Sequence, residues 1–560
     1  MVVTSASLFF LFTDSSTGYG QTAEPMDHRH GDIRFLNSTE CAVCHSFSRS
    51  ARAMRDQQGR NVAPSDLWSA SMMANSARDP YWRAVLSAEV AATPSQKTHI
   101  EEVCSRCHAP MAAPTTTSPE GQVLAFLDDR HPKAKLATDG VSCTVCHQIS
   151  PENLGTEASY TGGFVFNTDK LIYGPHANPV TMPMQHHVDY TPVQSDHMLR
   201  SSLCATCHTV ITHSFDESGQ ETQMRLHEQV PYFEWRNSVF NDEVAGNEAT
   251  GRSCQSCHMP QVDLDGQAIV TNLAHNPGGR DFPFLQPRQP FGRHTFAGGN
   301  VFMTQLIREN RERLGVVAAD EAFEHQVRES RTMLGTQTAS ITLGPISSLN
   351  SMTSLNVQIE NLAGHKFPTA YPSRRSWIEL VIKDAKGSVV FASGQVNSAG
   401  QLIDQNGQVL LSEKARGPIQ PHYVEINDSL QVQTYETFMG DTESQVTFAL
   451  LRGSVFIKDN RLLPKGWISN HPHAEATKPI GTIADEDFKA GGDQVSYRLS
   501  LPSGKYEATA KILFQSLSAR YVAELFETDT PEVQKFKHMY ERADLAPEVV
   551  GVAVASFIVD

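Results

Sequence analysis

The sequence predicts an α+β fold, in which a mainly helical and irregular N-terminal domain is followed by an antiparallel β-sandwich. Two observations predict it. Between residues 41 and 258, short helical patterns alternate with Gly- and Pro-rich loops around a repeated Cys-x-x-Cys-His motif. From about residue 340, short runs of alternating apolar and polar residues are separated by turns, as in β-sandwiches. We therefore expect domains over residues 26–335 and 336–560.

Five helical segments are expected in the N-terminal domain, because apolar residues recur there at helical spacing. The first has Asp66 as its N-cap, carries Met72 and Met73, and is interrupted at Pro80. The last is divided near residues 318–320. The segments cover residues 66–86, 98–108, 140–149, 230–241 and 300–334.

Strands dominate the C-terminal domain. Alternation at period two marks seven of them over about residues 336–515, and turn-forming stretches at 384–387 and 502–504 separate some of them. A helix over 531–542 and a last strand over 549–558 are expected to close the chain. The seven strands cover residues 340–343, 354–359, 377–382, 388–391, 445–451, 494–499 and 506–514.

Composition narrows the classes of partner. The chain has 560 residues, 40% of them hydrophobic, and a formal net charge of −16. A surface with this charge repels polyanions, which argues against nucleic acids and anionic membranes as partners. Because no run of about 20 apolar residues occurs, we expect no transmembrane helix.

All ten cysteines belong to five copies of Cys-x-x-Cys-His, so no thiol is left for a disulfide. This motif is the attachment signature of c-type haem. A zinc-binding interpretation needs pairs of such Cys-x-x-Cys units, and five is an odd number. We therefore predict five haem c groups, attached at Cys41, Cys44 and His45; Cys104, Cys107 and His108; Cys143, Cys146 and His147; Cys204, Cys207 and His208; and Cys254, Cys257 and His258.

Haem c is attached outside the cytoplasm in bacteria, so an export signal is expected before the first motif. Residues 6–12 form a short apolar run, and Gly18-Tyr19-Gly20 is a plausible cleavage site. No Lys or Arg precedes Arg29, so the basic start of a signal peptide is missing. We interpret residues 1–25 as a signal segment with a truncated or misassigned start, and expect a periplasmic or extracellular protein.

Each covalent tether holds the adjacent histidine under the iron, so His45, His108, His147, His208 and His258 are the predicted proximal ligands. The sixth ligand position on each iron decides the function. An iron with two strong protein ligands transfers electrons, whereas an open iron can bind a substrate. Eighteen further histidines could fill these positions.

Several segments resemble bacterial multihaem cytochromes c related to the cytochrome c-554 family, over roughly residues 35–375 and more loosely beyond. The resemblance implies electron transfer through closely stacked haems with mostly bis-histidine ligation. It also implies distal ligands at His294 and His365, which lie in matching His-x-Phe-x-Gly-Gly-Asn and Gly-His-x-Phe-Pro-Thr segments. His365 would then fasten the β domain to the haems. The resembling segments are 140–147, 202–208, 229–235, 254–260, 294–300 and 364–369.

Other residues are weaker candidates for the sixth position. Residues 151–193 are rich in Gly and Pro, as in a segment organised by a large cofactor, and hold several histidines. A methionine thioether can also ligate haem iron, although a Met pair on a helix more often packs in a core. The candidates, in order, are His187 and His186, His197, His176 and Met73, followed by His28, His30 and His99; His422, His471, His473 and His538 are expected to be ordinary β-domain residues.

Cytochrome c nitrite reductases also carry five haems, but their catalytic haem has Lys in place of the proximal His. All five motifs here end in His, which disfavours that activity. We expect a pentahaem cytochrome that passes electrons between other redox proteins or to an extracellular acceptor. Two alternatives stay open: an oxidoreductase acting on a small nitrogen or sulfur compound at one open haem, and a subunit of a polymeric, conductive filament.

Overall fold

The structure is a computed structural model, and it describes residues 28–30, 33–111, 127, 130–131, 133–349 and 352–560. The expected signal segment over residues 1–25 lies outside these residues. Helices hold 27% and strands 25% of the chain, with the helices mainly in the N-terminal part, so the predicted α+β class is confirmed. None of the helices in the described ranges is long and apolar enough to cross a membrane.

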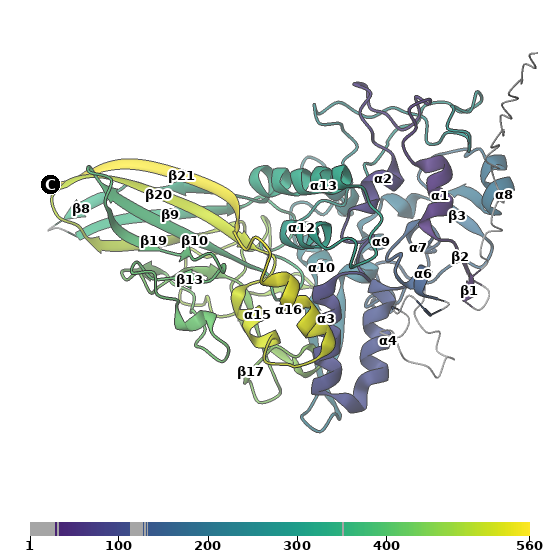
Figure 1. Cartoon of the computed structure of the whole chain (residues 1–560). Coiled ribbons are helices and arrows are strands. Elements are labelled where there is room, and N and C mark those ends of the chain that lie inside the picture. The colour runs from purple at the N-terminus through teal and green to yellow at the C-terminus, as the bar shows by residue number, and fades with distance from the viewer. Residues whose placement is uncertain (1–27, 31–32, 112–126, 128–129, 132, 350–351) are drawn as a thin grey trace, which may run out of the picture.

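We call residues 28–333 the motif region, since all five motifs lie there (Figure 1). It contains three small two-stranded sheets, in which β1 (His28–His30) pairs with β2 (Ile33–Phe35), β3 (Leu171–Gly174) with β4 (Thr191–Gln194), and β5 (Val210–Phe215) with β6 (Glu221–Gln229). Its helices are α1 (Ser38–His45), α2 (Pro64–Ser69), α3 (Pro80–Ala92), α4 (Lys97–His108), α6 (Ala134–Ala137), α7 (Cys143–Cys146), α8 (Met182–Val188), α9 (Ser201–His208), α10 (Pro231–Arg236), α11 (Cys254–His258), α12 (Val301–Glu309) and α13 (Asp320–Met333).

The prediction of a helix over residues 66–86 is wrong for the middle of this segment. Residues 70–79 form turns between α2 and α3, and the N-cap of α2 is Ala63 rather than Asp66. The Asn75 side chain donates to the carbonyls of Ser69 and Ser71, at 3.0 and 2.9 Å. Such side-chain bonds to the backbone compete with helix formation. Met73 therefore lies in a turn rather than on a helix.

The C-terminal part, residues 339–560, contains two five-stranded sheets, and we call it the β region. In one sheet the order is β11-β10-β20-β21, with β15 beside β10; in the other it is β14-β19-β9-β7, with β8 beside β9. Their strands are β7 (Ala339–Leu343), β8 (Ser347–Leu349), β9 (Met352–Asn361), β10 (Arg375–Asp384), β11 (Val389–Ser393), β14 (Glu425–Ile426), β15 (Thr434–Tyr435), β19 (Gly492–Ser500), β20 (Gly504–Gln515) and β21 (Glu548–Val559). All these pairs are antiparallel except β14 with β19, which is parallel.

The two sheets bury their inner faces in one apolar core. Val357 of β9 and Val495 of β19 belong to the same cluster as Ile378 of β10 and Ala510 of β20, and each of these side chains is completely buried. Strand β9 alternates buried and exposed residues along its length, as the sequence predicted. Burial of one face of each sheet thus explains the period-two pattern.

The strand expected over residues 445–451 is mostly absent. Only Val446–Thr447, strand β17, is extended, and Leu450–Arg452 forms a 3-10 turn. The Glu89 carboxylate of α3 accepts the backbone N–H groups of Leu450 and Leu451, at 2.6 and 3.2 Å. This contact with the motif region overrides the local strand preference.

The two regions are joined by helices near the C-terminus. Helices α15 (Ala519–Leu525) and α16 (Pro531–Tyr540) pack beside α3, as Figure 1 shows at the centre of the molecule. Tyr521 and Phe536 share an apolar cluster with Ala84 of α3 and Leu306 of α12. The position of the β region relative to the motifs is therefore fixed by an apolar contact.

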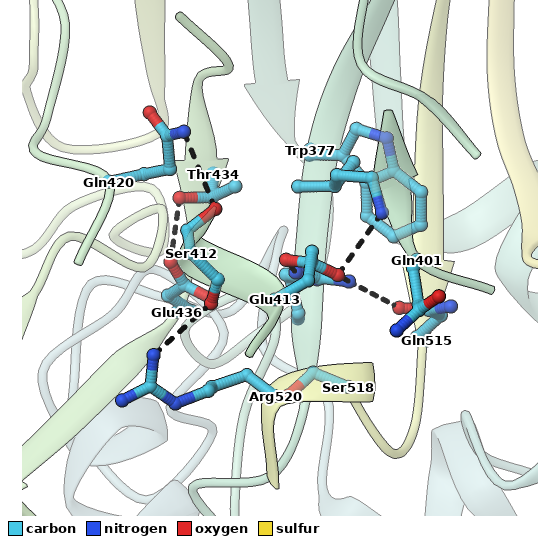
Figure 2. A network of polar contacts seen from close by, with 12 residues as sticks. Trp377, Gln401, Ser412, Glu413, Gln420, Thr434, Glu436, Gln515, Ser518 and Arg520 are labelled. Atoms are coloured by element: carbon cyan, nitrogen blue, oxygen red, sulfur yellow. Dashed lines mark hydrogen bonds and ion pairs between the residues drawn. The ribbon is translucent and has the colours of Figure 1, made fainter. Parts of the chain in front are cut away.

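A buried ion pair holds part of the β region together. The Arg375 guanidinium donates to both carboxylate oxygens of Glu413, at 2.6 and 3.0 Å, and to the Gln515 side chain at 2.8 Å. Figure 2 shows Glu413 and Gln515, the two partners of this guanidinium. Arg375 also lies over the Trp377 ring, at 5.1 Å from its centroid. Because the pair is buried, removing either charge would leave the other without a partner and would destabilise the fold.

Candidate haem-binding sites

The predicted proximal histidines are oriented by the backbone around them. In four of the five motifs, Nδ1 of the histidine donates to a carbonyl from a distant segment, which leaves Nε2 free to bind a metal. The bonds join His45 to Leu273 at 2.9 Å, His108 to Ser76 at 3.3 Å, His147 to Tyr173 at 2.6 Å and His258 to Ala297 at 2.6 Å.

Short helices present the motifs. Helix α1 begins at Ser38, whose backbone N–H and hydroxyl both donate to the Asp139 carboxylate, at 2.8 and 2.6 Å. Helix α11 is capped by Ser253, whose hydroxyl accepts the Ser256 N–H. Such caps fix the first turn, and the two cysteines and the histidine then occupy one short helix.

Thiols of different motifs touch one another. Cys41 is hydrogen-bonded to Cys143, and this contact, together with burial, raises the pKa of the Cys41 thiol. Cys107 bonds in the same way to Cys207. These contacts join the first motif to the third, and the second to the fourth.

Two further contacts complete the series. Cys204 is hydrogen-bonded to Cys254, which joins the fourth motif to the fifth. Cys146 of the third motif lies within electrostatic range of Cys207 of the fourth. In space, the motifs are therefore arranged in the order first, third, fourth and fifth, and the second motif lies beside the fourth. Each motif has another motif as a neighbour.

Two predicted distal histidines face proximal ones. The ring centroids of His147 and His294 are 6.4 Å apart, with 18° between the ring planes. Those of His258 and His365 are also 6.4 Å apart, with 11° between the planes. Two metal–nitrogen bonds of about 2 Å, in line between two imidazoles, put the ring centroids roughly 6 Å apart. Both pairs therefore have the spacing that one iron atom between them requires.

The rings of His294 and His365 are also oriented by hydrogen bonds and are neutral. Nδ1 of His294 donates to the Gly292 carbonyl at 3.0 Å, and Nδ1 of His365 donates to the Lys366 carbonyl at 2.9 Å. Burial lowers the pKa of His294 to about 4 and lowers the pKa of His365 as well. Neutral imidazole is the form that binds a metal.

His197 does not fit the role expected of it. Its Nδ1 is bonded to the Ser195 hydroxyl at 2.6 Å, and its Nε2 donates to the Ile149 carbonyl at 2.9 Å. Since both ring nitrogens are hydrogen-bonded within the protein, neither is available to bind iron. This geometry contradicts the predicted role of His197 as an iron ligand.

The remaining candidates are not paired with a proximal histidine. His186 and His187 are exposed on α8, and His176 is half-buried after β3. Met73 is half-buried in its turn, and the ring of His99 lies 5.5 Å from that of Phe215. Among the described residues, none of these histidines makes a ring contact with His45, His108 or His208.

One group of possible metal ligands lies far from the motifs. His422, Asp485 and Asp493 have ligand atoms within 4.8 Å of one another. However, Nδ1 of His422 accepts from the amides of Gln433 and Asn460, at 2.8 and 3.0 Å. The ring proton is therefore on Nε2, which donates to Asp485 at 2.8 Å. A metal would have to displace that proton, so this group is a hydrogen-bonded core cluster.

Sequence reasoning missed a group of ionisable residues beside the second and fourth motifs. Burial raises the pKa of Glu89 to about 7 and that of Glu228 to about 8. Both carboxyl groups lie within electrostatic range of Cys104. Burial lowers the pKa of Arg374 to about 10, and this residue acts in turn on His208. These three residues come from three separate segments of the chain, so no local sequence pattern predicts the group.

The attachment motifs and the oriented imidazoles are features typical of multihaem c-type cytochromes, a class of electron-transfer proteins. Residues 203–278, which hold the fourth and fifth motifs, match the model of the family described as cytochrome c554 and c-prime. The resemblance seen in the sequence is thereby confirmed over this segment.

Among solved structures, a penta-heme cytochrome c552 from Thermochromatium tepidum aligns with 93% of this chain and 99% of its own length. The sequence identity is 15% and the TM-score 0.49, a likeness too distant to define a shared fold. No curated protein matches the sequence.

Proposed function

We propose that the chain carries five haem c groups, one at each motif, and conducts electrons along them between redox partners outside the cytoplasm. The observation that supports this proposal is the series of neighbouring thiols, in which each motif has a cysteine close enough to act electrostatically on a cysteine of another motif. Haems attached at neighbouring thiols would lie edge to edge. Haem iron changes its redox state without leaving its ligands, and the protein sets its potential.

Two of the iron sites are proposed to have two histidine ligands. His147 with His294 would hold the iron of the third motif, and His258 with His365 that of the fifth. In each pair the backbone carbonyls fix the rings, so the ligands need not reorient when the charge of the iron changes. These sites are closed to substrate and suited to electron transfer.

Two measurements on the holoprotein test the proposal. Iron analysis and the absorbance of the pyridine haem complex should both give five haems per chain. Stepwise electrochemical reduction, followed at the α band, should take up five electrons with all haems in communication. A lower haem count, or haems that resist reduction through the others, would overturn it.

A second function has one observation in its favour. Glu89 and Glu228 lie near Cys104 of the second motif, and Arg374 lies near His208 of the fourth. Burial raises the pKa of Glu89 to about 7 and that of Glu228 to about 8. Groups of this kind supply and accept protons at catalytic sites. An open iron at the second or fourth motif would make the chain an oxidoreductase for a small nitrogen or sulfur compound.

Paramagnetic resonance separates the two functions. A high-spin signal that disappears on adding cyanide, nitrite or sulfite would favour an open, substrate-binding iron. Five low-spin signals that do not change when a ligand is added would support electron transfer and contradict the oxidoreductase function.

A further inference from the structure

Two loops that follow the first and fifth motifs form one lobe. We call residues 46–60 and 259–293 the arginine lobe. Met54 N–H donates to the Asn272 carbonyl at 3.0 Å, and the Ser48 hydroxyl donates to the Gly279 carbonyl at 2.6 Å. In Figure 1 these loops lie above α1 and α2, at the end of the molecule away from the β region.

The charge of this lobe is opposite to that of the rest of the chain. It contains seven Arg and four Asp residues and neither Lys nor Glu, a formal charge of +3. The whole chain has a formal charge of −16, so the remaining residues carry −19. The local excess of arginine therefore stands out against a strongly acidic background.

The aspartates of the lobe are occupied internally. Asp56 is paired with Arg60 at 2.5 Å, and Asp281 accepts the backbone N–H groups of Arg52 and Ala53, each at 2.9 Å. Asp263 accepts two further backbone N–H groups within its own turn. Asp265, the fourth aspartate, pairs with Arg60 at 2.7 Å. All four carboxylates are thus engaged within the lobe.

Three arginines provide that outer charge. Arg49, Arg52 and Arg280 are exposed, and none of them forms an ion pair with a carboxylate among the described residues. An exposed guanidinium without an internal partner is free to pair with a carboxylate on another protein.

Apolar side chains on the same lobe are also exposed. They belong to the hairpin over residues 261–269 and to the loops after it, and are between 38% and 51% exposed. A protein interface commonly combines such an apolar centre with a charged rim. These residues are Val262, Leu264, Val270 and Phe284.

The lobe adjoins an end of the motif series. The Leu273 carbonyl accepts the Nδ1–H of His45, so the lobe directly supports the proximal histidine of the first motif. The first motif contacts only the third through its thiols, which makes it a terminus of the series. A protein docked on the lobe would therefore be close to a terminal haem.

We propose that the arginine lobe is the docking face for an acidic redox protein, which exchanges electrons with the haem of the first motif. This inference rests on the electron-transfer function proposed above. Opposite charges would draw the partner to this face against the repulsion of the remaining surface and would raise the association rate. The exposed apolar residues would then exclude water from the contact.

Small oxidants of opposite charge test the sign of the local field. The reduced holoprotein is mixed in stopped flow with hexacyanoferrate(III), a trianion, or with tris(phenanthroline)cobalt(III), a trication. We expect the rate with the trianion to fall as ionic strength rises, despite the net charge of −16. The triple variant R49E/R52E/R280E should lower that rate about tenfold or more at low ionic strength.

A matched control and an acidic protein probe complete the experiment. The variant K383E/K386E/K505E changes the net charge equally on exposed residues of the β region, and should leave the rate unchanged. Reduced flavodoxin, an acidic carrier, should donate electrons to the wild type and the control faster than to the triple variant. The docking proposal would be overturned if the triple variant and the control variant reacted with hexacyanoferrate(III) at equal rates. It would also be overturned if the triple variant slowed the reaction with hexacyanoferrate(III) but not the reaction with flavodoxin. Failure of every reagent to exchange electrons would instead overturn the proposed function.

Discussion

The imidazole rings of His258 and His365 lie 11° from parallel with their centroids 6.4 Å apart, although His258 ends the fifth motif and His365 follows strand β9. His365 is held in place by the Lys366 carbonyl, and the Lys366 N–H donates to Glu234 of α10 at 3.0 Å. The ring from the β region is therefore positioned by hydrogen bonds to both regions. A change at His365 should affect both the iron site and the contact between the regions.

Replacing His365 by alanine tests this relationship. We expect His365→Ala to convert one low-spin haem to a high-spin one and to raise its reduction potential, since an imidazole donor is lost. Low-temperature paramagnetic resonance and a redox titration measure both effects. His187→Ala, at an exposed position, is the control and should change neither. An unchanged low-spin count in His365→Ala would show that another group ligates this iron.

The buried pair of Arg375 and Glu413 gives a prediction about stability. Glu413→Gln leaves the guanidinium buried without its counter-charge, which typically costs about 3–5 kcal/mol. Urea unfolding followed by circular dichroism measures the loss. Glu527→Gln removes an exposed partner of Arg416 and should leave the unfolding curve in place. Equal stability of the two variants would contradict the structural role of the buried pair.

Sequence patterns predicted the features that depend on residues close together in the chain. The five attachment sites remain a prediction from the cysteine spacing. Strands such as β9 and β20 were predicted correctly from their period-two alternation, because burial on one face imposes it. The parallel pairing of β14 with β19 could not be predicted in this way, since two-residue strands leave no periodicity to detect.

Contacts between residues far apart in the chain explain where the sequence-based predictions were wrong. The turn over residues 450–452 depends on the carboxylate of Glu89, more than 300 positions away in the chain. His294 was predicted as a distal ligand only through a family resemblance, because a lone histidine has no local signature. Its pairing with His147 was not predicted. The occupied nitrogens of His197 likewise depend on the Ile149 carbonyl, which sequence alone does not place beside it.

The core of the β region should lose stability as pH rises. Burial raises the pKa of Asp493 to about 7, above the unfolded value of about 3.9. The folded protein thus keeps a proton that the unfolded chain releases, so stability falls between about pH 4 and pH 7. Over this range the loss is of order 4 kcal/mol at most.

Asp493→Asn isolates this contribution, because the amide stays neutral at every pH. Urea midpoints at pH 5 and pH 7.5 should differ less in this variant than in the wild type. Asp487→Asn, at an exposed position nearby, should keep the wild-type difference. If Asp493→Asn also keeps it, another group is responsible for the pH dependence.

The cluster of His422, Asp485 and Asp493 should not bind a metal ion. Two amide groups donate to Nδ1 of His422, and each is fixed in turn: the Gln433 carbonyl accepts the Tyr423 N–H, and the Asn460 carbonyl accepts the Glu436 N–H. Neither amide can flip to let the ring proton move to Nδ1. We expect elemental analysis of the purified holoprotein to find iron but no stoichiometric zinc, calcium or manganese, and dialysis against a chelator to leave the unfolding midpoint unchanged. A second metal at one equivalent per chain, removed together with stability and lost in His422→Gln, would contradict this assignment.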